Sequence, residues 1–427
     1  MLSATRTFAP ALPPLLVAVA LLATPAGAQT SVERNVGVAD RPRLDYDPTG
    51  LQVGSFTLYP SVRVAADATD NYRATATDTQ SEAYLTLSPE VLLRSDWSLH
   101  AVEVGANFNR TVHAELPYED VSTFGGDFAG RLDVSSKTRI RLQANARREV
   151  ESRANLGSFR GSRDPVKLDT MGTELAIDQE FTKLRLGAAV GISRTDFTDV
   201  RDFSGAIVDQ DYRDVTTKYV TGNAALTVSP GLSLIVNARR DKLEYDLRPG
   251  KTGFDPSLLL DRGSVGTTIR GGVAVELSSL ILGTIEIGYL ERNYRDPRLR
   301  DVNGLSFAGN ILWNVTPLTS IRMRAARSIE ETSSRDTAGN LRNSYALLVD
   351  HELLRNMILT AEGSYATVKT IGSGTTGDEF ALGLSARYLV NRTLSFDAAI
   401  RHSERDSSNA AIRYKANAAT LSTRVAF

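Results

Sequence analysis

Hydrophobic and polar side chains alternate along most of the chain, most clearly from Ser264 to Tyr294. A period of two predicts β-strands. A short polar stretch around Ser278 and Ser279 separates two alternating runs, which predicts an antiparallel hairpin. The hydrophobic positions are Ile269, Val273, Val275 and Leu277, followed by Ile281, Ile285, Ile287 and Tyr289. The opposite positions hold glycines and single charges, a pattern typical of a transmembrane barrel with lipid outside and water inside.

The same arrangement of strand, tight turn, strand and longer polar loop recurs along the chain. The predicted tight turns are 94–97, 135–137, 181–183, 229–231, 278–279, 316–318, 354–356 and 390–392, and the long connections include 151–169, 198–214, 247–263, 331–342 and 371–377. With an opening strand from Gly54 and a closing strand from Tyr414 to Phe427, we expect roughly eighteen strands. The predicted fold is an all-β transmembrane antiparallel barrel with short periplasmic turns and long extracellular loops.

The N-terminus has the features of an export signal. Arg6 precedes an apolar run over 9–23, and small residues at 26–28 supply a cleavage site, so residues 1–28 are predicted to be a secretory signal peptide. Residues 29–53 are polar and aperiodic and are interpreted as a periplasmic lead-in. Residues 54–427 are predicted to form the barrel, which places the protein in the outer membrane of a Gram-negative cell.

Composition narrows the possible classes. The chain has 427 residues, no cysteine, 23% charged residues and a net charge of −1. No segment after residue 30 approaches the roughly 20 apolar residues of a transmembrane helix, and the scattered arginines do not favour nucleic-acid binding. The four histidines form no spaced metal motif, so we expect no enzyme, catalytic residue, metal or cofactor. His402 with Ser403 and Glu404 is the one cluster that merits inspection.

The alternation also assigns a lumen face with basic side chains. These lumen-facing candidates are Arg139, Arg141, Arg147, Lys183, Arg185, Arg322 and Arg324. One interpretation is that they guide an anionic polymer through a hydrated conduit. The other is that they pair with acidic residues on neighbouring strands and solvate the barrel interior.

Aromatic residues gather where the two membrane interfaces are expected. The predicted girdle comprises Trp97 and Trp313 beside tight turns, and Phe108, Phe197, Tyr245, Tyr289 and Tyr365 near loop ends. Such girdles bracket the apolar band of outer-membrane barrels.

Two parts of the chain resemble known outer-membrane sequences. Phe427, with Val425 and Leu421 on the same parity, resembles the closing strand by which the barrel-assembly machinery recognises its substrates, so Phe427 is the expected assembly signal. The block from Gly54 to His100, with Pro60, Asp70-Asn71 and Ser95-Asp96-Trp97-Ser98, resembles the β-barrel porin type 2 family. That resemblance implies an outer-membrane barrel, often associated with surface or exopolysaccharide export, and supplies no catalytic residue.

The sequence therefore favours a channel or scaffold for export of a surface polysaccharide. A general diffusion porin is the alternative, and an outer-membrane enzyme or a surface receptor remains open as well. The expected partners are outer-membrane lipid and lipopolysaccharide, the barrel-assembly machinery and polysaccharide export components, with no nucleic acid.

Overall fold

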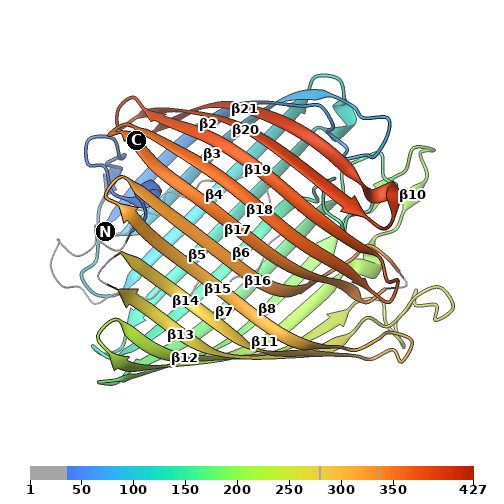
Figure 1. Cartoon of the computed structure of the whole chain (residues 1–427). Coiled ribbons are helices and arrows are strands. Elements are labelled where there is room, and N and C mark those ends of the chain that lie inside the picture. The colour runs from blue at the N-terminus through green and yellow to red at the C-terminus, as the bar shows by residue number, and fades with distance from the viewer. Residues whose placement is uncertain (1–35, 278–279, 336) are drawn as a thin grey trace.

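The computed structural model describes residues 36–277, 280–335 and 337–427. The predicted signal peptide and the turn at Ser278 and Ser279 lie outside the described residues. The described chain forms one closed antiparallel β-barrel (Figure 1), as the alternation predicts.

The barrel wall consists of long strands separated by short turns and longer loops. Its strands are β2 (Phe56–Thr69), β3 (Glu82–Ser95), β4 (Ala101–His113), β5 (Val121–Asp133), β6 (Thr138–Val150), β7 (Lys167–Glu180), β8 (Leu184–Phe197), β11 (Val215–Ser229), β12 (Leu232–Tyr245), β13 (Ser264–Leu277), β14 (Ile281–Tyr294), β15 (Val302–Thr316), β16 (Thr319–Glu330), β17 (Gly339–Leu354), β18 (Met357–Ile371), β19 (Thr376–Leu389), β20 (Leu394–Ser407) and β21 (Tyr414–Ala426).

Each of these strands pairs with the next barrel strand, and β2 pairs with β21 from Ser61↔Ala426 to Thr69↔Ala418, which closes the wall. The sheet has 19 strands when the three-residue β1 (Leu51–Val53) is included, and 18 strands form the closed barrel. The predicted count is therefore confirmed. In Figure 1 the C-terminus and the blue segment after residue 36 lie at one end of the barrel, and β10 lies among the long loops at the other.

The outer wall is apolar because the pleat sends alternate side chains to opposite faces. Ile285, Ile287 and Tyr289 on β14 are all exposed, with 62% of Ile287 accessible. Ile285 faces Val273 across the hairpin and Ile269 faces Tyr289. Such a continuous exposed apolar face belongs in hydrocarbon rather than in water.

Glycines on the inner face of β13 and β14 allow these two strands to approach closely. A Cβ at Gly272 would lie 2.0 Å from the carbonyl oxygen of Ile285, and one at Gly288 would lie 1.9 Å from that of Ile269. The strand partners of these glycines are Glu286 and Arg270, whose side chains pair at 3.4 Å. The glycines therefore leave room for a charged pair on the lumen side.

The remaining elements are short. They are β9 (Val200–Arg201), β10 (Ile207–Val208) and four 3-10 turns, η1 (Val38–Asp40), η2 (Pro117–Glu119), η3 (Asp211–Arg213) and η4 (Ala410–Ile412). No helix among the described residues has the length and hydrophobicity needed to cross a membrane.

A hollow of about 560 Å³ lies on the lipid-facing wall across β14 to β19. Gly309, Ala325 and Gly363 form its shallow floor, and rings of Tyr345 and Tyr365, stacked at 6.4 Å, stand beside them. Small residues between large aromatic ones therefore create this hollow, which is separate from the lumen.

Five of the seven aromatic residues predicted to form the girdle are exposed, and two are buried. Trp97, Trp313, Tyr289 and Tyr365 are exposed, and Phe108 is as well. Tyr245 is only 4% exposed and lies beneath the guanidinium of Arg262, 4.5 Å from the ring centroid. The girdle assignment of Tyr245 is wrong because its parity on β12 turns it inward, opposite to exposed Val236. Phe197 is also buried, beneath Arg213.

Candidate functional site

Most of the predicted lumen-facing basic residues are paired with carboxylates on the wall. Their ion pairs are Arg139 with Asp133 at 3.5 Å, Arg141 with Asp178 at 2.7 Å, Arg147 with Asp127 at 2.5 Å, Arg185 with Glu180 at 3.4 Å and Arg322 with Asp350 at 2.8 Å. Neighbouring opposite charges cancel at a distance, so these arginines do not form a continuous basic track.

Lys183 and Arg324 differ from the other members of the set. Lys183 lies in the exposed turn between β7 and β8 rather than within a strand, so its assignment to the lumen wall is wrong. Arg324 is an exposed residue of β16 on the same face as Arg322, and it forms no ion pair within the described chain. Arg324 is therefore a cation available to solutes.

The loop over residues 151–166 crosses the extracellular mouth of the barrel. It joins β6 to β7, yet its Gly157 carbonyl accepts a 2.9 Å hydrogen bond from Ser333 N in the β16–β17 loop. Six barrel strands (β8 and β11–β15) separate the two loops on one side and eight (β18–β21 and β2–β5) on the other. The contact therefore spans the mouth, and we call residues 151–166 the crossing loop.

A buried ion-pair network holds the crossing loop in place. Arg213 Nη2 lies 2.7 Å from Glu151 Oε1 and 3.1 Å from Glu331 Oε2, and the Arg213 side chain is 1% exposed. Burial, the largest effect, lowers the pKa of Arg213, but Glu331 and Glu151 together outweigh it and raise the pKa. Arg262 Nη1 extends the network to Glu331 at 3.3 Å. Four separate loops are thus joined above the lumen.

A second buried network ties the crossing loop to the β2–β3 and β4–β5 loops. Glu119 Oε1 accepts from Arg73 and from Arg153, each at 2.8 Å, and the Glu119 side chain is 1% exposed. Further along, Arg160 Nη1 donates to the Ala74 carbonyl at 3.1 Å. Because unpaired buried charges are costly, both networks favour one closed arrangement of the loops.

The described part of the N-terminal lead-in occupies the periplasmic end. Val38 is fully buried, and its N–H donates to Ser320 Oγ at 2.9 Å. Arg43 pairs with Glu352 on β17 at 3.1 Å, and Arg41 donates to the Pro317 carbonyl. Residues 36–43 therefore line the inner wall of β16 and β17 rather than hanging free below the barrel.

The same segment carries an acidic side chain to the lumen arginines. Asp40 Oδ2 lies 3.6 Å from Arg322 Nη1. Burial, the largest effect, and the nearby Asp350 hold the pKa of Asp40 above its ordinary value, although Arg322, Arg324 and Arg387 act to lower it. One carboxylate thus sits within reach of several guanidinium charges.

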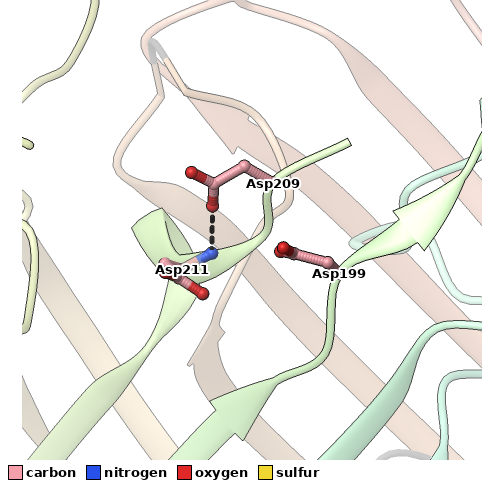
Figure 2. Close-up of side chains that lie close together, drawn as sticks. All are labelled: Asp199, Asp209 and Asp211. Carbon is pink, nitrogen blue, oxygen red and sulfur yellow. Dashed lines mark hydrogen bonds between the residues drawn. The ribbon is translucent and has the colours of Figure 1, made fainter. Parts of the chain in front are cut away.

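Three exposed carboxylates converge in the β8–β11 connection. Asp199, Asp209 and Asp211 each place one oxygen within 4.8 Å of the others (Figure 2). Asp209 accepts from the Asp211 backbone N–H at 2.8 Å, and Asp199 accepts from Gln210 N at 2.9 Å. These hydrogen bonds shape the connection, and oxygen ligands of this kind suit a hard cation.

The His402 cluster does not converge. Alternation on β20 separates Ser403 from His402 and Glu404. His402 Nε2 is 3.8 Å from Glu404, and its Nδ1 is hydrogen-bonded to Asn417 at 2.8 Å. The three residues lie partly buried within β20 and lack the aligned nucleophile and base of a hydrolytic site.

Sequence reasoning missed the residues that shape both mouths. Glu151, Arg213 and Glu331 come from three distant segments and meet at the extracellular mouth, whereas Asp40 meets Arg322 at the periplasmic end. Only barrel closure brings each of these sets together. The one available signal was the abundance of arginine and acidic residues in the long loops.

A closed barrel with an apolar exterior, a charged lumen and an inward-lying loop defines an outer-membrane protein of the porin class. Residues 43–427 match the family described as Putative beta-barrel porin 2. The chain belongs to this family. No curated protein matches the sequence.

Several solved structures are similar in architecture. OccK2 (OpdF) of Pseudomonas aeruginosa is 9% identical, with 88% of this chain and 99% of that chain covered and a TM-score of 0.48. A BenF-like porin from Pseudomonas fluorescens Pf-5 is 11% identical, with 88% and 100% covered and a TM-score of 0.48. The siderophore receptor PiuA from Acinetobacter baumannii is 11% identical, with 89% and 82% covered and a TM-score of 0.47.

Proposed function

We propose that the protein is a diffusion porin that passes small polar solutes across the outer membrane. The observation that carries this proposal is the crossing loop, which contacts the opposite side of the mouth through Gly157 and Ser333. An eighteen-stranded wall encloses an aqueous lumen, and a loop laid across it sets an upper limit on solute size.

Export of a surface polysaccharide has weaker support. A polymer would have to pass both the crossing loop and the lead-in segment at the periplasmic end. The wall arginines are matched by carboxylates, such as Arg141 by Asp178 at 2.7 Å, so they offer little net attraction to a polyanion. The general porin accounts for these features without requiring both ends to move.

Liposome swelling tests the proposal. Purified protein in liposomes should admit arabinose faster than glucose and glucose faster than a trisaccharide, because the constriction discriminates by size. Protein-free liposomes supply the baseline. Absence of arabinose uptake, or uptake of a long anionic polysaccharide at a comparable rate, would contradict the proposal.

A further inference from the structure

The carboxylate of Asp40, in the lead-in segment, faces the guanidinium of Arg322 in the lumen, a position that the carboxylate of a solute could also take. Asp40 Oδ2 is 3.6 Å from Arg322 Nη1, while Arg322 Nη2 is held by the fully buried Asp350 at 2.8 Å. Asp350 thus fixes the guanidinium, and the second nitrogen is directed to the segment. A guanidinium with one nitrogen held by the wall and the other open to the lumen is suited to bind an anion, because a preorganised cation loses little conformational freedom on binding.

Three arginines act on Asp40, and two of them have carboxylate partners of their own on the wall. Arg324 and Arg387 act on it as well as Arg322. Arg387 is neutralised by Asp397 at 2.7 Å, and Arg322 by Asp350. Arg324 forms no ion pair in the described chain, so a cation remains available beside the one that Asp40 contacts.

A few local contacts hold the segment on the wall. They are the burial of Val38, its hydrogen bond to Ser320, the Arg41 hydrogen bond to the Pro317 carbonyl and the Arg43 ion pair with Glu352. Asp40 itself remains 39% exposed and is separated from Arg322 by more than a normal hydrogen bond. An entering anion can therefore reach the guanidinium without unfolding any strand.

From this geometry we propose that Arg322 and Arg324 form a binding site for small carboxylates in the periplasmic half of the lumen, and that Asp40 is its internal competitor. A solute carboxylate replaces Asp40 at Arg322 and also engages Arg324, which releases residues 36–43 from the wall. The role of this site in solute passage rests on the proposed porin function, but carboxylate binding at Arg322 and Arg324 does not require that the barrel conducts.

Calorimetric titration of the detergent-solubilised full barrel with succinate tests the site directly, with uncharged succinamide as the matched solute. Asp40→Asn removes the competitor and should lower the succinate dissociation constant at least about threefold, because a larger fraction of sites is free. Asp45→Asn is the control, since Asp45 is an exposed carboxylate of the same segment. Arg324→Gln should weaken binding. No succinate binding, equal binding of succinamide, or equal constants for Asp40→Asn and wild type would each overturn the proposal.

An engineered disulfide tests the release of the segment. A Cβ at Gly37 would lie 3.8 Å from the Ser320 Cβ, which is the mean separation in disulfides, and the chain has no other cysteine. Oxidised Gly37→Cys/Ser320→Cys should bind succinate more weakly than its reduced form, with the single variants insensitive to reductant. Equal affinity in both redox states would overturn the release step. Because calorimetry needs no current, a protein that binds succinate but does not conduct would refute the porin function alone.

Discussion

Arg213 and Glu331 face each other at 3.1 Å across the extracellular mouth, one just before β11 and the other just after β16. Arg213 also holds Glu151 at the start of the crossing loop at 2.7 Å. A single guanidinium therefore fixes two loops that the wall alone would leave apart. The closed position of the crossing loop depends on this buried pair.

Replacing Arg213 by alanine should release the crossing loop. Truncation of one partner leaves buried Glu151 without its cation, and such losses cost about 3–5 kcal/mol. Hydrogen exchange over residues 151–166 should speed up, while the barrel strands stay protected. Arg194→Ala is the matched control because Arg194 forms exposed pairs with Asp196 and Asp246. Equal exchange in both variants would show that the network does not hold the loop.

The crossing loop should also escape proteolysis on intact cells. Arg153 and Arg160 lie in half-buried positions with hydrogen-bonded guanidinium groups. Lys251, in the connection between β12 and β13, is exposed. Trypsin should cleave after Lys251 well before it cleaves after Arg153 or Arg160. Cleavage at the tight turns alone would mean that the barrel has the reverse orientation.

The β8–β11 connection should loosen as pH rises from about 4 to about 7. Burial, followed by the charges of Asp196, Asp211 and Asp246, raises the pKa of Asp214 to about 7 despite the opposing Phe197 N–H. Because the pKa of Asp214 is higher in the folded state than the ordinary value of 3.8, its contribution to stability is fully present below the unfolded pKa and is lost progressively until pH reaches about 7. Hydrogen exchange over 198–214, corrected for its intrinsic pH dependence, measures this.

Two variants isolate the Asp214 contribution. Asp214→Asn keeps an oxygen for the Phe197 N–H, which donates at 2.7 Å, and should abolish the added pH dependence. Asp255→Asn is the control because hydrogen bonds from Ser257, the largest effect, lower the pKa of Asp255, so this carboxyl does not titrate near neutrality. Identical pH profiles for wild type and Asp214→Asn would assign the titration to another group.

A charged side chain introduced on the outer face of β14 should destabilise the barrel more than one introduced on the lumen face. Ile285 faces outward beside Val273 and Gly309, whereas its neighbour Thr284 faces the lumen. Ile285→Arg should destabilise the barrel by about 2–4 kcal/mol, the range found near the bilayer midplane, and Thr284→Arg should cost much less. Urea unfolding in lipid vesicles gives both values, and equal costs would reverse the assigned faces.

The number of strands and the side chains that face lipid were predictable from the sequence, because side chains alternate with a fixed period of two and closing the sheet into a barrel does not change that period. Tyr245 also follows this rule, because it lies an odd number of residues from exposed Val236 and therefore faces inward. The girdle prediction for Tyr245 failed because it relied on aromatic character and not on this alternation. The constriction was not predictable, because loop pairing has no period. Asp40 and Arg322 are far apart in sequence and meet only when the lead-in turns into the lumen. The roles of Phe427 in assembly and of residues 1–28 in export stay predictions.

Planar-bilayer conductance tests most directly whether the barrel is a water-filled pore that the crossing loop narrows. Wild-type protein should give discrete current steps, Arg213→Ala should give larger steps because the loop no longer spans the mouth, and Arg194→Ala should match wild type. A wild-type protein that inserts without conducting, or an Arg213→Ala variant with unchanged step size, would contradict the account.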